Sequence, residues 1–184
     1  MRGWTRVVAG ASVLLAGACA GDDAPRPDPA GATTATLSVT SAAFEPGGEI
    51  PPEFGCDGGG AFPALEWAGV PEGTQSLAVT ALDPDAPGGV FVHLLVADLP
   101  AGTAGLTDVT EIARGASIGA NGSGDAGYVP PCPPEGDDAH RYVFTVYAVD
   151  ATLDLGQGFT VGDLEAALDG HVLGSGEISG TFAR

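Results

Sequence analysis

The stretch that decides the fold is Ser76–Pro100, SLAVTALDPDAPGGVFVHLLVADLP. Two runs of small, β-branched and apolar residues, Leu77–Leu82 and Phe91–Val96, have the composition of buried strands. Pro84 and Pro87 lie between these runs, lack a backbone N–H and fix φ, so a sheet ladder cannot continue through the connection. The stretch therefore predicts two buried strands joined by a stiff loop.

Polar side chains gather around that loop. Asp83 and Asp85 flank a proline, and His93 follows on the second strand. We expect the His93 imidazole to point back toward the two carboxylates, because all three side chains would lie at the mouth of the sheet. A carboxylate and an imidazole within reach form a proton-sharing pair that suits an anion or a small polar group. Taken alone, the same residues also fit an Asp/Pro turn with a satisfied histidine.

A second polar stretch lies at Gly127–Gly136, GYVPPCPPEG, and is followed by DDAHRY. Four prolines around one cysteine predict a rigid, extended loop. His140 and Tyr142 lie two positions apart, so on a strand they share a face, while Arg141 points to the opposite face. The apolar run Val143–Val149 continues that predicted strand.

These residues resemble two motifs of the phosphatidylethanolamine-binding proteins, specifically the bacterial Raf kinase inhibitor-like branch. The motifs are D-P-D-A-P with a histidine on the next strand, and G-Y-x-G-P-x-P-P-x-G followed by H-R-Y. Pro63, Leu65 and Trp67 fit a third element of the family, and Trp67 is expected to be packing. Pro130 stands where the family has glycine, a change expected at one wall of the pocket. The resemblance implies a mainly β fold, an antiparallel β-sandwich with Greek-key character and a short C-terminal helix.

The resemblance also implies a small pocket for phosphate-like anions or a phospholipid head group. The residues that would line it are Asp83, Asp85, Pro87, His93, Pro133, Pro134, His140 and Tyr142. The histidines would donate hydrogen bonds, the tyrosine would add a hydroxyl, and the carboxylates would orient the imidazoles. Either histidine alone also fits a buried structural role, and their presence in two matching motifs favours the ligand site. No catalytic residue and no cofactor is predicted.

The first 35 residues predict export. Met1–Ala18 has two arginines, the apolar run Val7–Ala16 and small residues before Cys19, as in a secretory signal whose apolar run is too short to span a bilayer. The Ala-Gly-Ala-Cys sequence resembles a lipobox, so we expect Cys19 to be lipidated and to anchor the protein on the extracytoplasmic side of the cell membrane. The alternative is ordinary secretion with Cys19 removed. Residues 19–35 have the composition of a flexible tether.

The remaining cysteines predict a disulfide. If Cys19 is lipidated, Cys56 and Cys132 form an even pair in an oxidising compartment. Each lies in a motif beside the implied pocket, so we expect a disulfide that joins the two loops. A metal site is not expected, because the chain has neither C-x-x-C nor a closely spaced histidine pair.

Residues 36–184 are enough for one domain with its own core. Many short apolar runs between Gly, Pro and Asp turns indicate a mainly β architecture. One helix is predicted where Leu164, Ala167 and Leu168 share a face, with Gly170 at its C-terminal stop. The segment His171–Phe182 is expected to be the last strand, and His171, which lies in neither motif, is expected to be structural.

The charge of the chain restricts its partners. Residues 19–184 carry four arginines and no lysine against 24 acidic residues, hence a formal charge of −20. Such a surface is a poor partner for nucleic acid. It would also be repelled by an anionic membrane, so attachment would depend on the lipid at Cys19.

Three function classes follow. The leading hypothesis is a lipid-anchored, extracytoplasmic binding protein with a small anion pocket. The alternative is a secreted interaction or inhibitor module, with a protein partner and a vestigial pocket. A hydrolase that uses Asp and His is the third class, and Gly115–Gly119 also matches G-x-S-x-G with two histidines downstream. Its context differs from a nucleophile elbow, which needs an apolar strand before the serine and a helix after it.

Overall fold

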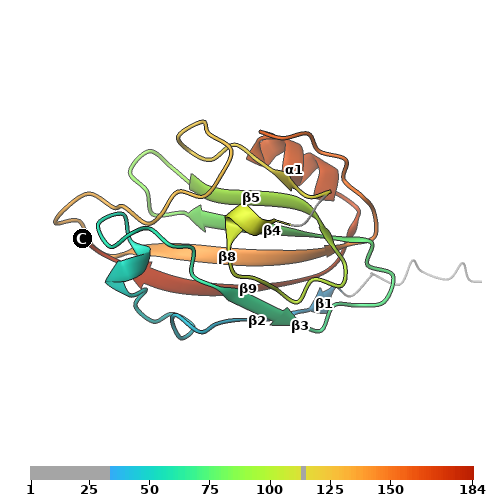
Figure 1. The fold of residues 1–184 in the computed structure, drawn as a ribbon, viewed down its shortest axis with the longest axis horizontal. Coiled ribbons are helices and arrows are strands. Elements are labelled where there is room, and N and C mark those ends of the chain that lie inside the picture. Colours follow the sequence, from blue (N-terminus) through green and yellow to red (C-terminus); the bar gives the residue numbers. More distant parts are fainter. Residues whose placement is uncertain (1–33, 113–114) are drawn as a thin grey trace, which may run out of the picture. The chain divides into compact units, whose positions relative to one another are not determined.

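The structure is a computed structural model that describes residues 34–112 and 115–184 (Figure 1). The predicted signal peptide, Cys19 and nearly all of the predicted tether lie outside the described residues. Within the described part of the chain, no helix is both long and apolar enough to cross a bilayer.

Two β-sheets make up most of the domain (Figure 1). The larger sheet has the strand order β1 (Ala35–Thr36), β9 (Val172–Phe182), β8 (His140–Val149), β4 (Ser76–Asp83), β5 (Phe91–Pro100) and β7 (Ser117–Ile118). The smaller sheet has the order β2 (Ser38–Ser41), β3 (Leu65–Ala68) and β6 (Gly105–Leu106). Two short 3₁₀ helices, η1 (Pro52–Phe54) and η2 (Val109–Glu111), and the helix α1 (Val161–Leu168) complete the elements. The predicted β-sandwich with a short C-terminal helix is confirmed.

The start of the domain differs from the prediction. Ala35, which was assigned to the tether, pairs with Gly174 in a parallel arrangement of β1 and β9. The larger sheet is therefore mixed rather than purely antiparallel. A two-residue strand of Ala and Thr carries no hydrophobic pattern, so its place in the sheet follows from tertiary pairing.

The main core lies between the two sheets. Leu77 and Val79 of β4 pack there together with Trp67 of the smaller sheet. The opposite face of the larger sheet is covered by α1, where Ala78 and Leu164 belong to a second cluster (Figure 1). Burial on both faces agrees with the small, β-branched and apolar composition of β4, from which a buried strand was predicted.

Helix α1 begins at a capping box, in which Thr160 and Asp163 exchange hydrogen bonds between side chain and backbone. Its buried residues are Leu164 and Leu168, and Gly170 adopts a left-handed φ of 78° just beyond its end. These features confirm the predicted helix and its stop.

The order of the larger sheet brings distant parts of the chain together. Strand β4 pairs on one side with β5, its neighbour in sequence, and on the other side with β8. The pairing of Leu82 with Val143 aligns the end of β4 with the start of β8. The two motifs of the sequence therefore meet at the same end of the sheet.

Candidate ligand-binding site

A buried carboxylate and imidazole form the centre of the candidate site. Asp83, at the end of β4, lies with its Oδ2 2.7 Å from Nδ1 of His140, at the start of β8. The two residues are 3% and 5% exposed. The other carboxylate oxygen of Asp83 accepts a hydrogen bond of 2.8 Å from the backbone N–H of Asp85. Both oxygens of Asp83 are therefore engaged within the protein.

Of the two imidazoles that the carboxylates were expected to orient, His140 contacts Asp83 and His93 does not. His93 was expected to face the carboxylates, but its Nδ1 donates to the carbonyl oxygen of Val129, 2.7 Å away. The reason is a β-bulge, since Ala81 pairs with Leu94 and Leu82 pairs with Val92, which leaves His93 as the extra residue. The bulge turns His93 toward the loop that carries Val129.

Burial also affects the charge of His93. Desolvation lowers the pKa of its imidazole below the ordinary value, and this effect outweighs the hydrogen bond to Val129 and the nearby charge of Asp83, which both act in the opposite direction. The neutral ring is therefore favoured in the folded protein.

Asp85 does not border the cavity, contrary to expectation. Its side chain is exposed, and Oδ2 accepts a hydrogen bond of 2.9 Å from the backbone N–H of Arg141. Asp85 thus fastens the loop after β4 to the start of β8. Arg141 itself is exposed while His140 and Tyr142 are buried, so the predicted alternation of faces is confirmed.

The other seven expected residues surround one cavity of about 250 Å³. They are Asp83, Pro87, His93, Pro133, Pro134, His140 and Tyr142. The wall also includes Pro130, together with four residues that sequence reasoning missed: Ala86, Phe91, Val129 and Cys132. Strand alternation could have found Phe91, because it lies two positions before His93, and the two rings are 4.9 Å apart.

Tyr142 closes one side of this cavity. Its ring meets that of His93 edge to face, with 5.1 Å between centroids. Burial, with the adjacent Asp83 carboxylate, raises the pKa of the Tyr142 hydroxyl well above its usual range. The hydroxyl therefore keeps its proton at all physiological pH values.

Pro130, the departure from the family motif, is accommodated by a glycine on the neighbouring loop. A Cβ atom at Gly60 would lie 3.0 Å from the Pro130 ring, and Gly60 has a left-handed φ of 69°. The absence of a side chain at Gly60 therefore leaves the space that Pro130 occupies.

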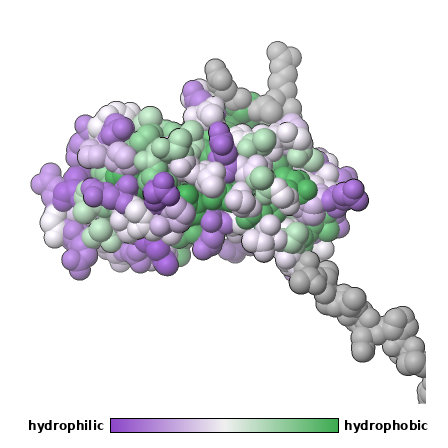
Figure 2. Space-filling model, turned by 90° about the horizontal axis from the view of Figure 1, so that it is seen from below, coloured by the Kyte–Doolittle hydropathy of each residue, from purple (hydrophilic) through white to green (hydrophobic). Residues whose placement is uncertain are grey.

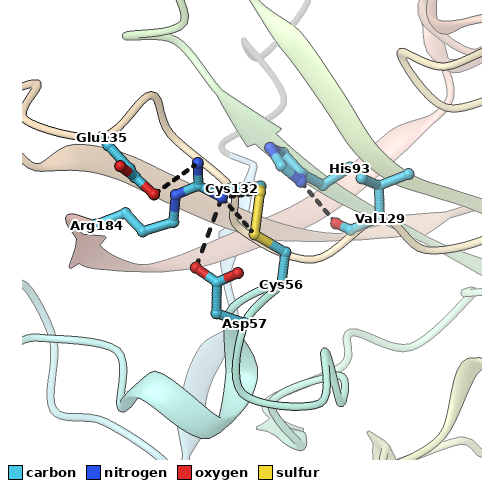
Figure 3. The surroundings of a disulfide bond; sticks show 7 residues. All are labelled: Cys56, Asp57, His93, Val129, Cys132, Glu135 and Arg184. Carbon is cyan, nitrogen blue, oxygen red and sulfur yellow. Dashed lines mark hydrogen bonds and ion pairs between the residues drawn. A yellow bond between two sulfur atoms is a disulfide. The ribbon is translucent and has the colours of Figure 1, made fainter.

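The predicted disulfide joins Cys56 to Cys132, with their Cα atoms 5.4 Å apart (Figure 3). Arg184 lies against it, with Nη1 3.3 Å from the sulfur of Cys56 and 3.1 Å from that of Cys132. The same guanidinium faces the carboxylates of Asp57 at 3.6 Å and Glu135 at 3.9 Å (Figure 3). Because Cys132 is part of the cavity wall, the disulfide fixes that wall to the loop of Cys56.

The remaining sequence candidates lie outside the cavity. Ser117 of the G-x-S-x-G match lies in β7, and an irregular segment rather than a helix follows it. His171 is on the surface, where its Nδ1 contacts Asp150 at 2.8 Å. Trp67 is 5% exposed and donates from Nε1 to the carbonyl of Thr103, which agrees with its predicted packing role. Residues 34–112 and 115–184 contain no cluster of three or more potential metal ligands.

Acidic side chains lie near the site. Figure 2 shows hydrophilic residues concentrated toward the end of the domain that carries η1 and Arg184. The acidic residues Asp57, Glu135 and Asp137 contribute there. Long-range electrostatics therefore oppose the approach of an anion, and any anion must be held by local donors.

The fold and the cavity define a β-sandwich protein with a small pocket at one end of its larger sheet. The chain belongs to the phosphatidylethanolamine-binding protein family, because the sequence model of that family matches residues 40–183. It is 40% identical over 152 residues to a UPF0098 protein of Methanothermobacter thermautotrophicus, an alignment that covers 80% of this chain and 99% of the relative.

Two further comparisons bear on the fold and on export. A crystal structure of a homologue of this family from Chlamydia trachomatis superposes with a TM-score of 0.75 at 36% identity, covering 81% of this chain and 98% of the other. A Mycobacterium tuberculosis protein named as a candidate lipoprotein, LppC, is 36% identical over 160 residues, which cover 87% of this chain and 77% of LppC.

Proposed function

We propose that this protein is an exported, lipid-anchored binding protein whose cavity takes a small anion such as phosphate or a phosphorylated head group. The observation that carries the proposal is the buried contact between Asp83 and His140 at a cavity of about 250 Å³. This volume lies below the range of roughly 300–1,000 Å³ for drug-sized ligands, which favours a small ligand.

The donors for such an anion are local. Nδ1 of His140 is directed at Asp83, so Nε2 is the nitrogen that remains for a ligand, and in the protonated ring it donates. The Asp83 carboxylate fixes the orientation of the His140 ring, as a carboxylate does for a metal-bound imidazole. Tyr142 also borders the cavity, and its hydroxyl keeps its proton beside the Asp83 carboxylate.

Thermal unfolding of the full chain tests the proposal. Phosphate and phosphoethanolamine are compared with chloride at matched ionic strength. A ligand at about 100 times its dissociation constant should add about 2.7 kcal/mol to the unfolding free energy. His140→Ala should abolish this gain.

His171→Ala is the matched control, because His171 makes the same type of contact with a carboxylate but lies on the surface, outside the cavity. This variant should keep the full response to phosphate. If the unmodified protein does not respond beyond the chloride control, the anion pocket is refuted and the interaction-module hypothesis becomes the better one.

The lipid anchor is tested separately. The proposal rests on the lipobox-like sequence before Cys19 and on the resemblance to LppC. Expressed in a bacterium with labelled palmitate, the protein should carry label and sediment with membranes. Cys19→Ala should lose the label, and a labelled Cys19→Ala variant would contradict lipidation at this position.

A further inference from the structure

The orientation of the His93 ring is fixed by Val129. Nδ1 of His93 lies 2.7 Å from the Val129 carbonyl oxygen (Figure 3). The Val129 N–H donates to the His93 carbonyl at 3.0 Å. Because a carbonyl oxygen can only accept, Nδ1 must carry a proton. In the neutral ring, Nε2 therefore has a lone pair and can only accept a hydrogen bond.

This Nε2 atom is buried and has no hydrogen-bond partner among the residues that the structure describes. His93 is 4% exposed and borders the cavity. The titratable side chains that affect it are Asp83 and His140. Both oxygens of Asp83 are already engaged, so Asp83 contributes no donor. A buried acceptor without a donor, at the wall of a cavity, indicates that the donor comes from the ligand.

The ring stays neutral under ordinary conditions. The usual pKa of histidine is 6.5, and burial lowers that of His93. When the pH is above the lowered pKa of His93, the ring is neutral and cannot supply a second N–H to a ligand oxygen. An oxygen without a hydrogen would then place its lone pairs against that of Nε2, which is repulsive.

We propose that the pocket selects oxyanions that still carry an O–H group, namely inorganic phosphate or a protonated phosphate monoester, whose hydroxyl donates to His93 Nε2. This inference rests on the proposed function and narrows its ligand class. Sulfate has a similar shape but has lost its protons near neutral pH. The phosphodiester of a phospholipid likewise has no P–O–H group, so the inference favours free phosphate, or a monoester in its singly protonated form, over an intact lipid.

Isothermal titration calorimetry of the full chain at about pH 7.5 and constant ionic strength tests the selection. The probes are inorganic phosphate, sulfate and dimethyl phosphate. A buried unpaired acceptor costs enough free energy that phosphate should bind about 10- to 100-fold more tightly than either other anion.

The variant His93→Gln tests whether Nε2 of His93 causes the preference for phosphate. The glutamine amide offers a donor as well as an acceptor, so the preference for phosphate over sulfate should fall toward unity. His171→Gln, which changes a histidine outside the cavity in the same way, should keep the preference of the unmodified protein. If His93→Gln does not fold, ¹⁵N NMR of the unmodified protein gives a second readout. The Nε2 resonance should be that of an unprotonated nitrogen and should move on addition of phosphate but not of sulfate.

The outcomes distinguish a failure of the proposed selectivity from a failure of the anion pocket itself. Sulfate or dimethyl phosphate binding as tightly as phosphate would overturn the inference while leaving the anion pocket in place. A protonated Nε2 in the unliganded protein would overturn it as well. Absence of binding by all three anions would contradict the proposed function and the inference together.

Discussion

Asp83 and His140 are 57 positions apart in the chain, yet their side chains meet at 2.7 Å within the protein interior. Asp150 and His171 make the same kind of contact at 2.8 Å on the surface. The side chains of the first pair are 5% and 7% exposed, and those of the second pair 44% and 50%. The two pairs share their chemistry and differ in burial.

Removal of one carboxylate from each pair should therefore have unequal effects. Asp83→Ala leaves a buried imidazole without its partner and should lower the unfolding free energy by about 1–3 kcal/mol. Asp150→Ala breaks a solvated contact and should cost less than about 1 kcal/mol. Urea denaturation monitored by tryptophan fluorescence measures both. Equal losses would mean that burial does not determine the contribution of the Asp83–His140 contact.

The disulfide should contribute substantially to stability. Cys56 and Cys132 are separated by 76 positions, and closure of so long a loop restricts the unfolded chain. The double variant Cys56→Ala/Cys132→Ala should lose about 4 kcal/mol of unfolding free energy. Reduction of the unmodified protein with a dithiol should reproduce this loss. A double variant as stable as the oxidised protein would contradict the prediction.

Stability should depend on pH through His93. The pKa of its imidazole is lowered from 6.5 in the folded protein, so on acidification the unfolded chain takes up a proton first. The unfolding free energy should therefore fall as pH decreases below about 6.5, until the folded ring is also protonated.

His93→Gln removes this contribution and leaves every other titrating group in place. The unfolding free energy of the variant, measured in urea from about pH 8 to about pH 5, should fall less steeply than that of the unmodified protein. Parallel curves for the two proteins would show that His93 is not responsible.

Gly176 of β9 should not tolerate a side chain. A Cβ atom there would lie 2.2 Å from the backbone oxygen of Leu37, a contact that only a backbone shift can relieve. We expect Gly176→Ala to be destabilising by about 1–3 kcal/mol, as for other overpacked sites. Gly156→Ala is the control, because no atom lies within 4 Å of the added group. Thermal unfolding compares the two, and similar melting temperatures would refute the prediction.

Much of the fold could be predicted because local signals and tertiary structure agree. The apolar composition of β4, the helical face of Leu164 and Leu168 and the stop at Gly170 each follow from short-range rules. The pairing of β1 with β9 could not, since Ala35 has no pattern that distinguishes it from the tether.

The sequence predicted most of the residues of the candidate site but not the contacts between them. Residue type and motif brought His93 and His140 into one hypothesis together with Asp83. Which imidazole contacts Asp83 depends on a shift in the register of β4 against β5, and a single-residue bulge has no signature in the composition of a strand. The exclusion of Asp85 from the cavity has a similar origin, because its partner is a backbone N–H of Arg141.

The bulge at His93 also divides β5 into a part that borders the cavity and a part that packs in the core. Leu94, Leu95 and Val96 of β5 pair in register with β4, and their side chains are buried in the core on both faces of the sheet. Phe91–His93 lie on the other side of the shift, and His93 takes its position from the loop of Val129. Substitutions in this short segment can therefore change what the cavity recognises while the inward-facing residues of the same strand keep their places. One strand thus combines a recognition end that can change with an end that is held by core packing, and the bulge is the boundary between them.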